Sequence, residues 1–243
     1  MQPHRLSTYS RIIILVILVL GINLFSVYQF DLQTMRAVRS VSTLVFLIVY
    51  FLLTTCRNRW VTGALVVLTL RDFMHLFFER SWGVELYLAL GTLTYILLII
   101  ERVPFMKVSG FKKSSFSLAA LFSLGNIVIL YVLSGFVENQ MQGALELPLF
   151  YCLGGSLIVL VSSAFYYNFT LNSNRSLLFA LMVTGFIIAD ICACLAYFND
   201  YEGLWYADRL FYAFSLGCLI CFAIDSEGAR REQEDIDILK DSL

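Results

Sequence analysis

The sequence has few charged residues, and this shortage restricts the class of protein to which the chain can belong. Only 14% of the 243 residues are charged and 59% are hydrophobic, with a mean hydropathy of +0.79. About a quarter of the residues in a soluble domain are charged, so the composition predicts an integral membrane protein. The net charge of −1 and the lack of basic clusters interleaved with aromatic residues exclude a nucleic-acid-binding protein.

Other absences exclude particular kinds of site. Two histidines are too few for a three-histidine zinc site, and no lysine lies inside an apolar run to form a Schiff base with retinal. The sequence also has no glycine-rich phosphate loop and no serine nucleophile elbow. Cys218 and Cys221 are close enough to share a helical face, but two further metal ligands are missing. We therefore predict buried reduced thiols and neither a metal nor a cofactor.

Long hydrophobic runs dominate what is present. A transmembrane helix needs roughly 17–25 mainly apolar residues, and eight runs qualify, at about 11–30, 39–55, 60–78, 84–100, 115–137, 147–168, 176–197 and 204–224. The first run lacks a small-residue cleavage site, which favours a span over a signal peptide. The sequence predicts an all-α bundle of about eight transmembrane helices. It forms a single domain over residues 1–243, with a charged tail at 225–243.

The basic residues predict the orientation of the chain. With the amino terminus in the cytoplasm, most of them fall on the cytoplasmic side, as the positive-inside rule requires. The basic residues that fall outside are Arg36, Arg39 and Arg80. We expect a multi-pass protein of a bacterial inner membrane or an endomembrane, with both termini in the cytoplasm.

Asp72 and Asp190 are acidic residues inside apolar runs, where ionisable side chains are costly and usually functional. Counted from the inner ends of their helices, they lie roughly 18 and 21 Å along at 1.5 Å per residue. Equal depth predicts that the two carboxyls meet in the outer half of the membrane. Such a pair shares a proton and offers one acid and one base. Alternatively, Asp72 has a structural role, bonded to Arg71, to Arg209 or across helices.

Arg71 and His75 accompany Asp72 on the third predicted helix and are candidate ligand-binding residues. They are one turn apart, so they share a helical face. His75 can orient an aspartate or carry its proton near neutral pH. The alternative for His75 is a polar packing residue near the membrane interface.

Asp208, Arg209 and Tyr212 begin the last predicted helix and are further candidates for a binding cavity. Arg209 can hold a phosphate or carboxylate with two parallel hydrogen bonds. The favoured alternative is that Arg209 extends to the outer surface beside Trp205 and Tyr206, in an interfacial aromatic belt.

The order of these features resembles the YhhN-like membrane family, whose characterised members include the vertebrate lysoplasmalogenases. That family has an aspartate in its third span and another in its seventh, which correspond to Asp72 and Asp190. The residues Pro148 to Tyr151 resemble the start of its sixth span, and Tyr212 matches a tyrosine of its eighth. The chain departs from the pattern where Arg71 precedes the first aspartate. It also lacks the histidine of the fourth span and the glutamine that follows the tyrosine.

The resemblance implies hydrolysis of the vinyl ether bond of a lysoplasmalogen, a membrane lysolipid, with Asp72 and Asp190 as catalytic residues. An acid would protonate the β-carbon, and a carboxylate would activate water to attack the resulting oxocarbenium. Two alternatives remain open: a carrier or sensor of lipids or small molecules, and a proton-coupled transporter. Against transport, the sequence shows no clearly broken helix, since Gly154-Gly155 is the one glycine pair in a span.

Overall fold

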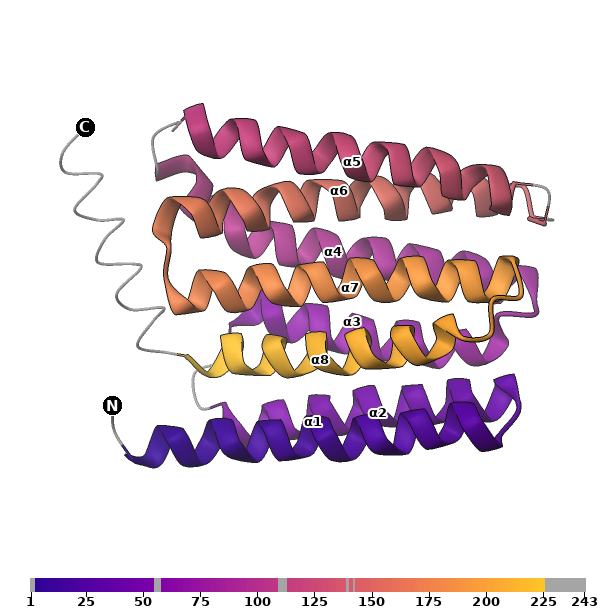
Figure 1. Ribbon diagram of the computed structural model, residues 1–243, viewed down its shortest axis with the longest axis horizontal. Coiled ribbons are helices and arrows are strands. Elements are labelled where there is room, and N and C mark those ends of the chain that lie inside the picture. The colour runs from indigo at the N-terminus through magenta and orange to yellow at the C-terminus, as the bar shows by residue number, and fades with distance from the viewer. Residues whose placement is uncertain (1–2, 55–57, 109–112, 139, 142, 226–243) are drawn as a thin grey trace.

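The computed structural model describes residues 3–54, 58–108, 113–138, 140, 141 and 143–225 (Figure 1). This part of the chain contains helices and no strands, and eight of its helices are long and apolar enough to cross a membrane. The predicted class, an α-helical membrane bundle, is confirmed. The elements are α1 (Pro3–Gln29), α2 (Leu32–Leu53), α3 (Arg59–Met74), η1 (His75–Phe77), α4 (Ser81–Val108), α5 (Lys113–Val137), α6 (Glu146–Leu171), α7 (Asn174–Phe198) and α8 (Leu204–Ile224).

The helices lie side by side and run alternately in opposite directions (Figure 1). α5 lies at one edge, against α6, and α1 and α2 lie at the other. α4 packs against α3 and α6, and α7 has its most extensive contacts with α8. Because α1 begins and α8 ends at the same end of the bundle, these two helix ends lie on one side of the membrane. That this side is cytoplasmic stays a prediction, and the tail from residue 226 onward lies outside the described residues.

α2 begins earlier than the sequence predicts, and this changes the position of two arginines. Asp31 caps the helix by accepting hydrogen bonds from the amide and hydroxyl groups of Thr34. These bonds stabilise the charged carboxylate, so they lower the pKa of Asp31. The hydrophobic run seemed to start at residue 39, whereas the helix starts at Leu32. Arg36 and Arg39, predicted to lie in an outer loop, are therefore inside α2 and fully buried.

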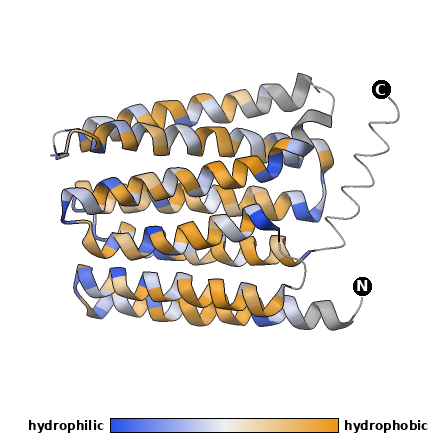
Figure 2. Cartoon of the chain, turned by 180° about the vertical axis from the view of Figure 1, so that it is seen from behind, coloured by the Kyte–Doolittle hydropathy of each residue, from blue (hydrophilic) through white to orange (hydrophobic). Residues whose placement is uncertain are grey.

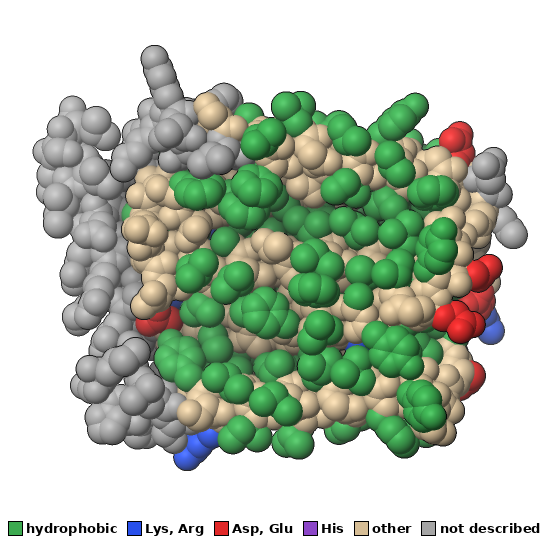
Figure 3. All heavy atoms as spheres, viewed as in Figure 1, with side chains coloured by type: hydrophobic (Ala, Val, Ile, Leu, Met, Phe, Trp, Pro, Cys, Tyr) green, Lys and Arg blue, Asp and Glu red, His purple; other side chains and the backbone are tan. Residues whose placement is uncertain are grey.

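The bundle exposes apolar side chains along its length, as a lipid-facing surface requires. Hydrophobic residues prevail along the middle of the helices, and most hydrophilic ones lie towards the ends (Figure 2). Hydrophobic side chains cover the face in Figure 3, and acidic side chains gather at the end where α7 and α8 are connected. We call this the α7–α8 loop end. These distributions are consistent with a helix bundle that spans a membrane.

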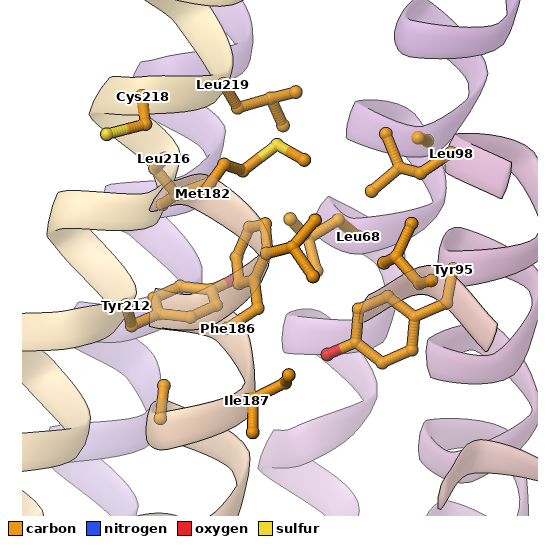
Figure 4. Close-up of a cluster of buried hydrophobic side chains, with 14 of the residues drawn as sticks. Leu68, Tyr95, Leu98, Met182, Phe186, Ile187, Tyr212, Leu216, Cys218 and Leu219 are labelled. Carbon is orange, nitrogen blue, oxygen red and sulfur yellow. The ribbon is translucent and has the colours of Figure 1, made fainter. Parts of the chain in front are cut away.

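The interior combines an apolar core with polar side chains. Leu68 of α3, Tyr95 of α4, Phe186 of α7 and Tyr212 of α8 pack in one buried cluster (Figure 4). Close approach of α7 to α8 depends on Gly185, where an added Cβ would lie 2.1 Å from Ser215 Oγ and 3.2 Å from a backbone oxygen. Buried arginines sit among these apolar residues, and their partners define the candidate site.

Candidate functional site

Asp72 and Asp190 each have an arginine and a tyrosine of their own. Asp72 lies 3.3 Å from Arg39 Nε and accepts a hydrogen bond from the Tyr212 hydroxyl. Asp190 accepts a hydrogen bond of 2.7 Å from Arg71 Nη2 and another from the Tyr95 hydroxyl. The expected pair of carboxyls is thus replaced by two separate ion pairs. The structural alternative for Asp72 is correct in kind, but its arginine partner comes from α2.

Asp72 belongs to a sealed network that joins α2, α3 and α8. Arg39 Nη1 donates to both carboxylate oxygens of Asp208, at 2.9 and 3.1 Å, and the Arg39 guanidinium lies 3.8 Å from the Tyr212 ring centre. Thr43 donates a further hydrogen bond to Asp72. These side chains are at most 3% exposed. A polar network so completely enclosed fixes how the helices pack, because breaking one ion pair would leave its partner charged in an apolar interior.

Arg209 also belongs to this network and does not extend to the surface. Its side chain is 1% exposed, and Nη1 donates a 2.6 Å hydrogen bond to Asp208. Its guanidinium lies 5.7 Å from the Trp205 ring, and Trp205 is itself buried. The expected extension of Arg209 to the outer surface is therefore wrong, since a carboxylate inside the bundle holds the charge.

Asp190 belongs to a second group of polar side chains, which lies beside a cavity. Arg71 connects the group, since Nη2 donates to the Tyr87 hydroxyl at 2.7 Å as well as to Asp190. Its guanidinium lies 4.4 Å from the Tyr87 ring. The His75 ring also packs against that ring, with centroids 4.9 Å apart. We call Arg71, His75, Tyr87, Tyr95 and Asp190 the Arg71 cluster.

The cavity beside the Arg71 cluster is mainly apolar. Its volume is about 110 Å³, and its walls come chiefly from α4, α5, α6 and α7. Arg71, His75, Tyr87 and Asp190 line it, together with residues such as Leu133 and Leu157. An apolar pocket with a few convergent polar groups is the usual form of a small-molecule site. We call it the inner cavity.

The other predicted site residues lie away from the inner cavity. Asp72, Asp208, Arg209 and Tyr212 do not line it. They hydrogen bond within the sealed network instead. The two aspartates therefore differ in environment, and Asp190 is the one that a ligand in the inner cavity can approach.

A second, more polar cavity adjoins the first at the α7–α8 loop end. Its volume is about 140 Å³, and its polar lining includes Glu79, Arg80, Ser81, Gln140 and Glu146. It shares walls with the inner cavity, formed by Phe78, Val84, Met141, Tyr197 and Phe198. We call it the outer cavity. Because the two cavities share these walls, the outer cavity provides a polar space next to the inner cavity.

Glu79 ties the shared wall to α2. It accepts a hydrogen bond of 3.0 Å from the Tyr197 hydroxyl and lies 2.9 Å from Arg36 Nη1. The Arg36 guanidinium also lies 5.4 Å from the Tyr197 ring and 5.5 Å from the Phe78 ring. Glu79 therefore holds part of the wall between the cavities.

Two polar atoms of the Arg71 cluster are buried without a hydrogen-bond partner. They are Arg71 Nε and His75 Nδ1, whose residues are 1% and 4% exposed. Gly91 lies beside the first, because a Cβ added there would be 3.1 Å from Arg71 Nε. Buried polar groups usually have a partner, and both residues line the inner cavity, so these atoms indicate a place for a ligand or a water molecule there.

Sequence reasoning found three cavity residues and missed the tyrosines. Arg71, His75 and Asp190 were expected and do line the inner cavity. Tyr87 and Tyr95 were overlooked because tyrosine is common in membrane spans. Their spacing of eight, with Gly91 between them, places all three on one face of α4 and is the signal that could have revealed them.

The structure also describes Cys218 and Cys221, which were considered as metal ligands, and three other cysteines. Cys152, Cys192, Cys194, Cys218 and Cys221 are free thiols, and Cys56 lies outside the described residues. Within the described part of the chain, no three His, Cys, Asp or Glu side chains are grouped in a way that could hold a metal ion.

Comparison with known proteins adds no assignment. The chain matches no protein-family model, no curated protein and no solved structure. The resemblance to the YhhN-like family stays a prediction that depends on the motif residues.

Proposed function

We propose that the protein binds a single-chain, lipid-like molecule in the inner cavity, with the polar part of the ligand beside the Arg71 cluster. The observation that carries the proposal is the cavity itself. It has apolar walls from four membrane-spanning helices and an ion pair, Arg71–Asp190, at one side. Ionisable groups inside a membrane are costly, and they usually mark a ligand site.

The helix arrangement supports access from the lipid. α5 packs extensively against α6 but makes few contacts with α7, and both α5 and α7 contribute side chains to the inner cavity. Separation of α5 from α7 therefore disturbs little packing. We expect the apolar chain of the ligand to enter between these two helices.

Photolabelling tests this proposal. The purified protein in lipid nanodiscs is labelled with a long-chain alcohol that carries a diazirine in the middle of its chain. We expect labels on cavity residues such as Leu133, Leu157 and Ile191, and an excess of the unlabelled alcohol should remove them. Labels confined to lipid-facing residues such as Val159 and Leu177, which are exposed, would contradict the proposal.

A second candidate function is hydrolysis of the vinyl ether of a lysoplasmalogen, and the position of Asp190 favours it. Protonation of the β-carbon would give an oxocarbenium, and water would add to it to form a hemiacetal. The hemiacetal would break down to a fatty aldehyde and a glycerophospho head group. Held by Arg71 and Tyr95, Asp190 suits the base that activates water. His75 is another residue of the cavity that can carry a proton.

This version gives Asp72 no part in the chemistry, because Asp72 is sealed in the network around Arg39. The test is release of aldehyde from a lysoplasmalogen by the purified protein. We expect Asp190→Asn to abolish release. Asp72→Asn, measured per folded molecule, should retain it. Failure of the wild-type protein to release aldehyde would exclude hydrolysis of this substrate and leave the binding proposal to be decided by photolabelling.

A further inference from the structure

The Arg71 cluster offers a hydrogen-bond donor that the protein does not use. Arg71 Nε carries an N–H group and is buried without a partner. An unsatisfied buried donor is destabilising, and more so when the group is charged. Since Arg71 lines the inner cavity, an oxygen atom of a ligand can accept the hydrogen bond. His75 Nδ1 is a second unpartnered nitrogen on the same cavity wall.

The charges around this donor are already balanced. Arg71 is paired with Asp190 at 2.7 Å. Behind it, Arg39 lies between Asp72 and Asp208, Arg209 is paired with Asp208, and Arg36 is paired with Glu79. Four arginines thus face four carboxylates. An anion placed here would be buried without a counter-charge of its own, which is strongly unfavourable.

We infer that the part of the ligand beside Arg71 is an uncharged hydrogen-bond acceptor, such as a carbonyl, ether or hydroxyl oxygen, and not an anionic group. The inference rests on the proposed function and names the class of ligand for that site. The unused donor and the balanced charge both favour an uncharged ligand group. A neutral oxygen satisfies the N–H group without adding charge to a low-dielectric interior. A charged head group would have to lie elsewhere, and the outer cavity is the polar space that adjoins the site.

A ligand series with one constant chain tests the inference. The saturated alcohol, its methyl ester, the corresponding carboxylate at alkaline pH and the unsubstituted alkane compete with the photoactivatable alcohol for wild-type protein in nanodiscs. We expect the alcohol and the ester to bind about tenfold or more tightly than the carboxylate, which corresponds to about 1.4 kcal/mol. The alkane should also bind more weakly than either. Equal or tighter binding of the carboxylate would overturn the inference, as would equal binding of the alkane.

Removing the charge of Asp190 provides a second test of the inference. Asp190→Asn removes the counter-charge of Arg71, so we expect this variant to reverse the preference and bind the carboxylate more tightly than the alcohol. Asp200→Asn makes the same chemical change in the exposed α7–α8 connection and should keep the wild-type preference. An Asp190→Asn variant that still favours the alcohol would contradict the charge argument.

Two further outcomes are distinguishable. Should Asp190→Asn fail to fold, the wild-type series still decides the question by itself. Should no member of the series compete with the photoactivatable alcohol in the wild type, the proposed function fails together with the inference. A series that binds in the opposite order would refute the inference alone.

Discussion

Arg71 Nη2 lies 2.7 Å from Asp190 Oδ1 and joins two residues that are 119 positions apart. The next residue along the chain, Asp72, turns away to meet Arg39 and Tyr212. Successive residues of an α-helix point about 100° apart, so the neighbouring charged residues of α3 contact different helices. Arg71 faces α4 and α7, and Asp72 faces α2 and α8. This divergence separates a cavity-lining ion pair from a sealed structural one.

The sealed network predicts a large loss of stability for Asp72→Asn. The change leaves Arg39 with one carboxylate partner in an apolar interior, so we expect the free energy of unfolding to fall by about 3–5 kcal/mol. Tyr212→Phe removes one hydrogen bond from the same carboxylate and should cost about 1 kcal/mol. Thermal unfolding in detergent micelles would measure both changes. An Asp72→Asn variant as stable as the wild type would show that Asp72 is not a structural charge.

Gly185 predicts a packing defect at the α7–α8 contact. In Gly185→Ala the new methyl group would lie 2.1 Å from Ser215 Oγ and close to the backbone of α8. We expect a loss of about 1–3 kcal/mol in stability, as for other overpacked interiors. Gly155→Ala on α6 is the matched control, because nothing lies within 4 Å of its added Cβ. Equal unfolding temperatures for the two variants would mean that α7 can move away from α8 without cost.

Filling the inner cavity should reduce ligand binding while the bundle remains folded. Leu157→Trp places a large ring in the cavity, so we expect affinity for the long-chain alcohol to fall about tenfold or more. Val159→Trp is two residues away on the same helix and faces outward, so it should bind like the wild type. Competition against the photoactivatable alcohol measures both. Equal affinity in the two variants would place the ligand outside the inner cavity.

The orientation of the chain is testable with introduced cysteines. Tyr201, between α7 and α8, and Asn174, at the start of α7, are exposed at opposite ends of the same helix. The excess of basic residues at the Asn174 end predicts that this end is cytoplasmic. In intact cells a membrane-impermeant thiol reagent should therefore label Tyr201→Cys and not Asn174→Cys. The unsubstituted protein gives the background from the native cysteines. The reverse pattern would invert the topology.

Hydropathy was sufficient to predict the fold class, but it was not sufficient to locate the ends of helices that contain charged residues. Arg36 and Arg39 seemed to lie outside the second span because their charges interrupt the hydrophobic run. In the structure the charges are compensated by Glu79, Asp72 and Asp208. A hydropathy average over neighbouring residues does not include partners that lie 33 to 169 positions away. It therefore places the start of the helix too late in the chain.

The sequence by itself determined the class of protein, since its eight apolar runs are long and apolar enough to cross a membrane. It also determined that Arg71, Asp72, His75 and Asp190 would lie inside membrane-spanning helices, because all four fall within those runs. Only the tertiary structure decided which arginine pairs with which carboxylate. That depends on the rotation of each helix about its axis, which is fixed by packing against neighbours distant in the chain. A rotation of about 100° per residue decides whether a carboxylate faces an arginine, another carboxylate or an open cavity.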